Sequence, residues 1–148
     1  MALGPLSSEL IRDPEFDQLI ASICKHPQMY VNPATLGGVC AWIDGFNHGR
    51  GGSPLLGLRE WLVVRARGGN NLHWTGLAFR EIAGDRNADY NRGDDPELIT
   101  KLGQFLQDFL AYREANGLSK IFWDYAEWLR RQEWYSGPLT SAPSTDAS

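Results

Sequence analysis

The sequence predicts an all-α, single-domain bundle of five or six helices, with a short strand pair near residues 71–82 as a local alternative. Apolar residues recur at helical spacing in several segments, and two of these segments open with the same Asp-Pro-Glu start signal. A chain of 148 residues, 43% of them hydrophobic, can also bury one core without metals or disulfides. We place the helical domain at residues 1–135 and a disordered tail at residues 136–148, which are too polar to order themselves by burial.

The first two helices are predicted from their caps and their apolar stripes. Asp13 can accept hydrogen bonds from free amides, and Pro14 sits where its missing N–H costs nothing, so the first helix is expected to begin there. It should end at His26, because the residue before Pro27 avoids the helical region. After an extended link, Thr35 is expected to cap a second helix that glycines close. The two stripes are Phe16, Leu19, Ile20 and Ile23, then Leu36, Val39, Cys40, Ile43 and Phe46.

The middle of the chain holds a third helix and an ambiguous segment. The third helix should open at Ser53-Pro54 by the same capping logic and end in the run Arg-Ala-Arg-Gly-Gly at residues 65–69, where cations complement the helix dipole. Residues 72–79 have apolar spacing that fits a helix, whereas Gly76 and the aromatic residues would also suit a strand. We favour a helix there.

The second half contains the clearest helix of the chain. It follows a polar, turn-rich loop at residues 84–95, begins at the second Asp-Pro-Glu signal and carries a wide apolar face. Asn116-Gly117 supplies a left-handed stop, and Ser119 is expected to cap a final helix. The apolar faces consist of Leu98, Ile99, Leu102, Phe105, Leu106, Phe109 and Leu110, then Ile121, Phe122, Tyr125, Trp128 and Leu129.

Charge and composition argue against several partners. Lys and Arg number 14 against 18 Asp and Glu, and the resulting net charge of −4 disfavours binding to nucleic acid. No stretch approaches the roughly 18 uncharged apolar residues of a membrane span, so no membrane partner is expected. Acids near the N-terminus and two cysteines without a CxxC pair indicate a protein of the reducing cytoplasm.

No pattern of residues indicates catalysis, so we predict that the protein is not an enzyme and has no catalytic residues, metal site or cofactor. The three histidines lie on separate segments without metal-ligand spacing. Cys40 belongs to an apolar stripe, where burial makes a thiol inert. The glycine-rich residues 49–54 lack the Lys-Ser/Thr pair of a phosphate-binding loop.

Aromatic and charged residues near the C-terminus form the candidate partner-binding face. The sequence has six tryptophans: Trp61, Trp74 and Trp128 fall on apolar stripes, whereas Trp42, Trp123 and Trp134 do not. Exposed Trp, Tyr and Arg are the residue types that dominate binding hot spots, and exposed acids steer a basic partner. The candidate residues are Trp123, Asp124, Glu127, Arg130, Arg131, Trp134 and Tyr135, with Asp85, Asp89 and Asp94 of the polar loop. The alternative is an aromatic lid over the core with a solvated charged side.

Four short motifs resemble small bacterial proteins, some of which are similar to immunity proteins encoded beside polymorphic toxins. The motifs are P-x-M-Y at residues 27–30, A-x-I-x-G-F at residues 41–46, L-x-x-W-L at residues 58–62 and N-L-x-W at residues 71–74. The resemblance runs over residues 10–135 and implies one-to-one binding of a cognate toxin domain, without catalysis. The acidic balance would suit a toxin that is basic because it acts on nucleic acid.

Two other functions stay open. One is a small helical enzyme or ligand-binding domain whose aromatic pocket would be lined by Tyr30, Trp61, His73 and Trp74. The other is a self-associating structural module.

Overall fold

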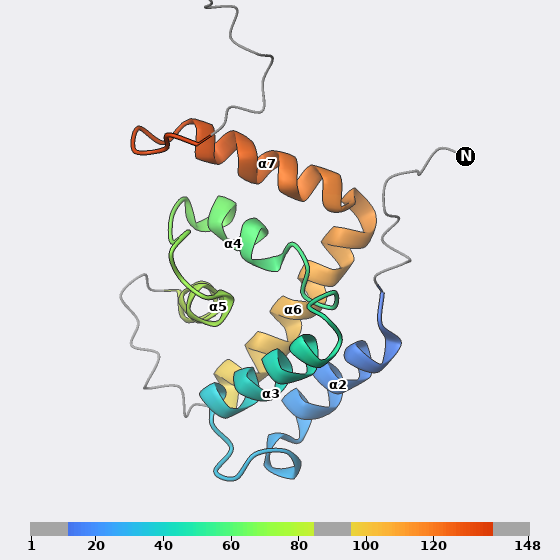
Figure 1. The fold of residues 1–148 in the computed structure, drawn as a ribbon. Helices are drawn as coiled ribbons and strands as arrows, with labels where there is room; N and C mark the ends of the chain where they lie inside the picture. The colour runs from blue at the N-terminus through green and yellow to red at the C-terminus, as the bar shows by residue number, and fades with distance from the viewer. Residues whose placement is uncertain (1–11, 85–95, 138–148) are drawn as a thin grey trace, which may run out of the picture.

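The computed structural model describes residues 12–84 and 96–137. Within these ranges the chain forms six α-helices and one 3-10 turn and no strand, which confirms the all-α bundle (Figure 1). The elements are α2 (Pro14–Lys25), η1 (Pro27–Met29), α3 (Leu36–Gly49), α4 (Leu58–Ala66), α5 (Trp74–Ala83), α6 (Pro96–Asn116) and α7 (Leu118–Arg130). The strand pair considered near residues 71–82 is wrong, because α5 occupies most of this segment. The polar loop after Gly84 and the tail after Gly137 lie outside the described residues.

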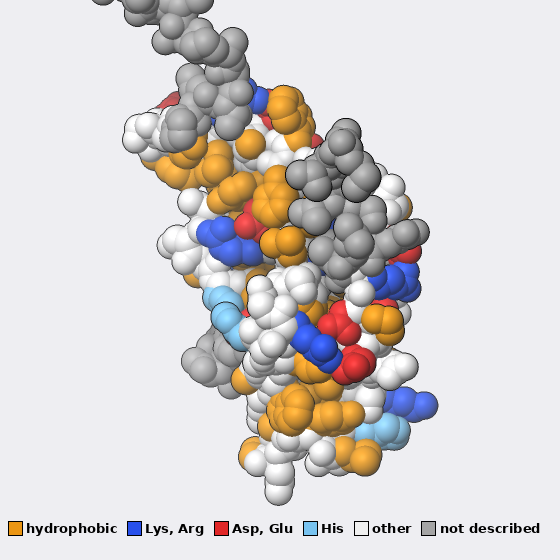
Figure 2. All heavy atoms as spheres, turned by 45° about the vertical axis from the view of Figure 1, so that its right-hand side comes forward, with side chains coloured by type: hydrophobic (Ala, Val, Ile, Leu, Met, Phe, Trp, Pro, Cys, Tyr) orange, Lys and Arg blue, Asp and Glu red, His pale blue; other side chains and the backbone are white. Residues whose placement is uncertain are grey.

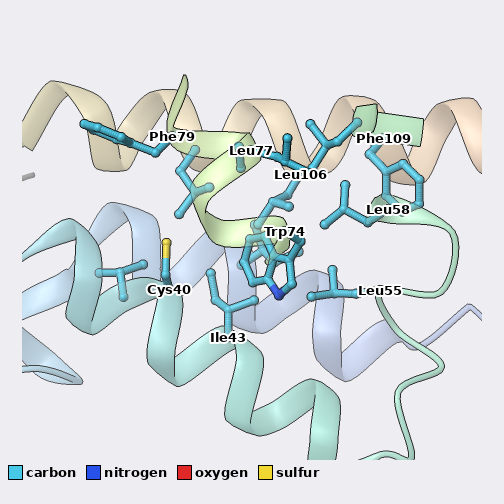
Figure 3. Close-up of a cluster of buried hydrophobic side chains, with 14 of the residues drawn as sticks. Cys40, Ile43, Leu55, Leu58, Trp74, Leu77, Phe79, Leu106 and Phe109 are labelled. Carbon is cyan, nitrogen blue, oxygen red and sulfur yellow. The ribbon is translucent and has the colours of Figure 1, made fainter. Parts of the chain in front are cut away.

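The longest helix, α6, runs through the middle of the molecule and contacts most of the other helices (Figure 1). α2 packs along α6, α3 packs against both of these helices, and α5 packs on the flank of α6. At the C-terminal end of α6 the chain turns back into α7, which lies beside α4. In the core, Figure 3 shows Trp74 of α5 among the side chains of Ile43, Leu55 and Leu106. All six described helices and the chain before α4 therefore contribute to one apolar core, part of which Figure 3 shows.

Local caps start the first two helices as the sequence predicts. Asp13 Oδ1 accepts hydrogen bonds from the amides of Glu15 and Phe16, at 3.1 and 3.2 Å. Thr35 Oγ1 accepts a hydrogen bond from the amide of Gly38 at 3.0 Å. Each cap satisfies an amide that has no partner within its helix, a contribution of about 1 kcal/mol.

The third helix does not open at Ser53-Pro54 as expected; it begins at Leu58, after a turn that ends in Gly57 with φ of +90°. The reason is the buried Arg113 of α6, which is 3% exposed. Its Nη1 donates to the backbone carbonyls of Ser53, Pro54 and Leu56, at 3.4, 3.0 and 3.0 Å. The guanidinium group therefore holds this segment as a turn against α6.

The final helix also begins differently from the prediction. Gly117, with φ of +86°, ends α6 and takes the N-cap position of α7 without a side-chain cap, so Ser119 lies inside the helix instead of capping it. The buried Leu118 opens the helix and packs close to Gly57, where an added Cβ would lie 3.1 Å from its Cδ2. Core packing thus sets this boundary. None of the described helices combines the length and apolar character that a membrane crossing requires.

Candidate protein-binding site

The helix α7 buries little of its apolar surface. Its only fully buried side chains are Leu118 and Ile121, both in its first turns. Further along, Phe122 and Trp123 are 38% and 62% exposed, and Trp134 beyond the helix is 57% exposed. Figure 2 shows hydrophobic side chains gathered over the upper end of the molecule, which α7 forms in Figure 1. Large apolar groups exposed together are typical of interaction sites.

A groove of about 930 Å³ lies between the C-terminal end of α4 and the stretch from Trp123 to Gln132, which covers the later turns of α7 and the residues after it. We call it the α4–α7 groove. Its lining combines two indole rings with charged groups of both signs. The lining residues are Val64, Arg67, Trp123, Asp124, Glu127, Trp128, Arg131 and Gln132.

A row of aromatic rings passes through Trp128, which lines the groove, and continues beyond α7. Tyr125 stacks on Trp128, with ring centroids 6.2 Å apart. Trp128 meets Trp134 edge to face at 6.2 Å, and Trp134 meets Tyr135 in the same way at 6.4 Å. Such contacts favour fixed ring orientations, so the row offers a partner large apolar surfaces at a small entropic cost.

The acidic groups of the groove are matched by cations on α7 itself. Asp124 accepts a hydrogen bond from Lys120 Nζ at 3.1 Å, and this bond raises the pKa of Lys120. Glu127 forms an ion pair with Arg130. The guanidinium group of Arg130 also lies 5.9 Å from the ring centroid of Trp123. These contacts fix the polar edge of α7 beside its aromatic side.

The structure brings the predicted C-terminal residues together on one face. Four of them line the groove, namely Trp123, Asp124, Glu127 and Arg131. Of the other three, Arg130 pairs with Glu127 and Trp134 meets Trp128 of the lining, whereas Tyr135 meets Trp134. The predicted loop residues Asp85, Asp89 and Asp94 lie outside the described residues.

Sequence reasoning missed the α4 wall of the groove, which Val64 and Arg67 form. The pattern correctly indicated that residues 65–69 end a helix, but nothing in it pairs this end with α7. The division of the tryptophans is confirmed: Trp42, Trp123 and Trp134 are exposed, whereas Trp74 is buried and Trp61 and Trp128 pack against the core.

The four residues expected to line an aromatic pocket are divided among three places. Trp61 packs on Phe105 and Phe109, with ring centroids 5.4 Å apart in each pair. Tyr30 lies edge-on to Trp42, at 5.4 Å. Only His73 and Trp74 meet, beside Asp44.

Asp44 is a polar junction between α3 and α5. Its Oδ1 accepts a hydrogen bond from Trp74 Nε1 at 2.8 Å, and its Oδ2 lies 3.4 Å from His73 Nε2 and 3.5 Å from His48 Nε2. No group of three or more His, Cys, Asp or Glu side chains within residues 12–84 and 96–137 is arranged to hold a metal ion. The contacts of Asp44 with His73 and Trp74 join α3 to the start of α5, whereas His48 lies on α3 itself.

The cysteines are poor nucleophiles. Cys40 is buried in the core, and Cys24 lies half-buried in a hollow of about 400 Å³ between α2 and α6. Burial raises the pKa of Cys24 from 9.0 to about 12, and the nearby Cys40 thiol adds to this effect. The reactive thiolate form is therefore almost absent from Cys24 at neutral pH.

Comparisons with protein-family models, with curated protein sequences and with solved structures found no match. Function is therefore inferred from the α4–α7 groove and the chemistry of its lining.

Proposed function

We propose that the protein is a cytoplasmic protein-binding inhibitor, an immunity protein that neutralises a cognate bacterial toxin by one-to-one binding. The observation that carries the proposal is the α4–α7 groove, with the exposed Trp123 in its lining and an aromatic row that leads from Trp128 to the exposed Trp134. The toxin is proposed from the sequence motifs that resemble immunity proteins. The groove supports protein binding in general.

The exposed indole of Trp123 is the expected centre of the interface. It is 62% exposed, and the guanidinium group of Arg130 beside it limits its freedom. Covering such a ring removes apolar surface from water at little cost in side-chain entropy. Replacement of a central Trp in an interface typically costs 2 kcal/mol or more, which is about 30-fold in affinity.

The test begins with capture of a partner and ends with a growth assay. Tagged protein is used to isolate a stoichiometric partner from a lysate of the bacterium that encodes it, and that partner is then expressed alone and together with this protein. We expect the partner to arrest growth alone and to be harmless in the co-expressing cells. Trp123→Ala should weaken the complex by about 30-fold and restore the growth arrest.

Met29→Ala is the matched control for an exposed apolar side chain. Met29 is 76% exposed and lies in the link between α2 and α3, at the end of the molecule opposite α7 (Figure 1). Met29→Ala should bind the partner as tightly as the wild type does, and cells that co-express it with the partner should grow as they do with the wild type. A partner that does not harm cells would overturn the inhibitor function, and equal losses from both variants would overturn the assignment of the face.

Self-association through the same face predicts a different result. Analytical ultracentrifugation of the protein alone would then show a dimer that Trp123→Ala converts to a monomer. The proposed inhibitor is instead expected to sediment as a monomer and to form a heterodimer with its partner.

A further inference from the structure

The α4–α7 groove carries unmatched positive charge, and from it we infer the chemistry of the segment that docks there. We propose that the groove binds an acidic stretch of a partner polypeptide, in which an Asp or Glu side chain lies next to an apolar one. This inference rests on the proposed protein-binding function and adds the chemistry of the recognised segment.

The charges of the groove do not cancel. Asp124 and Glu127 are matched by Lys120 and Arg130 within α7. The exposed Arg67 and Arg131 also line the groove, but their guanidinium groups form no hydrogen bond, ion pair or ring contact with any residue of the described chain. Although the whole chain carries a net charge of −4, the unpaired groups in this groove are both cations.

The two arginines lie at the same end of the groove. Arg67 is the C-cap of α4 and Arg131 is the C-cap of α7. These helices lie beside each other and run in the same direction, so their C-terminal ends coincide (Figure 1). A carboxylate entering this end could accept hydrogen bonds from both guanidinium groups, each of which presents donors in a planar fork.

The backbone at Arg67 indicates that the fold does not require an arginine there. Its φ is +56°, the only positive φ of a non-glycine residue among those described. This left-handed conformation favours glycine at a helix end, and two glycines follow directly as Gly68 and Gly69. Strain of this kind is typically retained where the side chain serves a function.

The remaining lining favours a polypeptide over a nucleic acid. Asp124 and Glu127 would repel a chain of phosphates laid along α7, whereas a single carboxylate at the arginine end avoids them. Trp123 and Trp128 supply the apolar wall on which a neighbouring Leu or Phe of the partner can pack.

A selection of phage-displayed random peptides on the full-length protein tests the inference. Enriched peptides should carry Asp or Glu next to an apolar residue, and the Gln analogue of the selected Glu should bind less tightly. The double variant Arg67→Gly, Arg131→Gln should lower the affinity for the selected peptide by about tenfold or more. Arg80→Gln is the matched control, because Arg80 is an exposed arginine of α5 outside the groove. This variant should bind the selected peptide with the same affinity as the wild type.

Arg67→Gly alone separates binding from folding. Glycine relieves the left-handed backbone, so the melting temperature should stay the same or rise while the peptide affinity falls. A fall in affinity accompanied by a fall in melting temperature would contradict the docking role of Arg67.

Several outcomes would overturn the inference: no enriched motif, a basic or uncharged motif, undiminished binding by the double variant, or displacement of the peptide by a single-stranded oligonucleotide. The proposed function fails separately. If the toxin complex needs Trp123 but not the two arginines, the inhibitor function is supported and the binding of an acidic segment is contradicted. If acidic peptides bind through the arginines but the captured partner does not harm cells, the binding of an acidic segment is supported and the inhibitor function is contradicted.

Discussion

Cys24 makes the stability of the protein depend on alkaline pH. Its pKa is raised by burial from 9.0 to about 12, so the unfolded chain loses this proton at a lower pH than the folded chain. The free energy of unfolding should therefore be unaffected by this group below about pH 9 and should fall as the pH rises toward 12, by up to about 1.4 kcal/mol per pH unit.

Urea unfolding at about pH 8 and about pH 10.5 measures this loss, and Cys24→Ala supplies the reference. Tyrosines and lysines titrate in both proteins, so only the difference between them reports the thiol. The wild type should lose more stability than the variant over this interval. Equal losses would show that Cys24 ionises as readily in the folded protein as in the unfolded chain.

Arg113 marks a limit of sequence reasoning at the level of single residues. Its place on the predicted helix gave no sign that it would be 3% exposed. Burial lowers its pKa, while the carboxylate of Asp17 opposes that shift. Its three carbonyl acceptors lie 57 to 60 residues earlier in the chain, so no local pattern could have identified them.

At the level of helices, Gly103 sets the spacing between α2 and α6. A Cβ at this position would lie 2.8 Å from Cys24 Cβ and 3.0 Å from its Sγ, which is too close for the present packing. Gly103→Ala should therefore push the helices apart and lower the free energy of unfolding by about 1–3 kcal/mol, as measured by urea denaturation.

Gly76→Ala is the control for the intrinsic preference of helices for alanine. Gly76 lies within α5, and a Cβ there would meet nothing within 4 Å. The free energy of unfolding of this variant should rise by about 0.5–1 kcal/mol, because alanine loses less backbone entropy than glycine when the chain folds. Similar effects of the two substitutions would contradict the close approach of α2 and α6.

The boundaries that the sequence predicted correctly are those with local causes. Asp13 and Thr35 satisfy amides within their own first turns, and Gly117 supplies the left-handed stop after α6. The starts of α4 and α7 were placed wrongly, because contacts with Arg113 and the packing of Leu118 determine them. Local signals thus fix a helix end where no distant group competes for the same backbone atoms.

The candidate site divides in the same way. Residue type and spacing identified the α7 side, since Trp123 and Trp134 fall off the apolar stripe. The α4 side depends on contacts between residues 64–67 and 123–132, which no periodicity within either segment reveals. The unmatched charge of Arg67 and Arg131 appears only when the two helix ends are placed together.

For the whole molecule, the distribution of buried side chains predicts unequal protection from hydrogen exchange. α6 buries Ile99, Leu102, Leu106 and Phe109 almost completely, whereas α7 buries nothing fully after Ile121. Amides of α6 should therefore exchange only on global unfolding, and those of the second half of α7 should exchange faster through local opening.

Mass spectrometry of peptic fragments after timed exchange in deuterated water measures both rates. Binding of the captured partner should slow exchange in α7 and at the end of α4, and should leave the segment joining α2 to α3 unchanged. Equal protection of α6 and α7 in the free protein would contradict the weak anchoring of α7.

Net charge and groove charge act at different distances. The acidic surface of the whole chain would speed the approach of a basic toxin, since long-range attraction depends on summed charge. Contact then depends on the few groups that meet, and at the proposed docking site those are two unpaired arginines and the indoles. A toxin that is basic overall can therefore present an acidic segment to the groove.

The pairing of α4 with α7 also determines when in its synthesis the chain could first bind. The ribosome makes α4 while more than 50 residues separate it from Leu118, the start of α7. The proposed groove cannot form until α7 has left the exit tunnel and packed on α4, so a nascent or truncated chain would be inactive. Under the proposed function, only chains in which α7 has been synthesised and has packed on α4 would bind a partner.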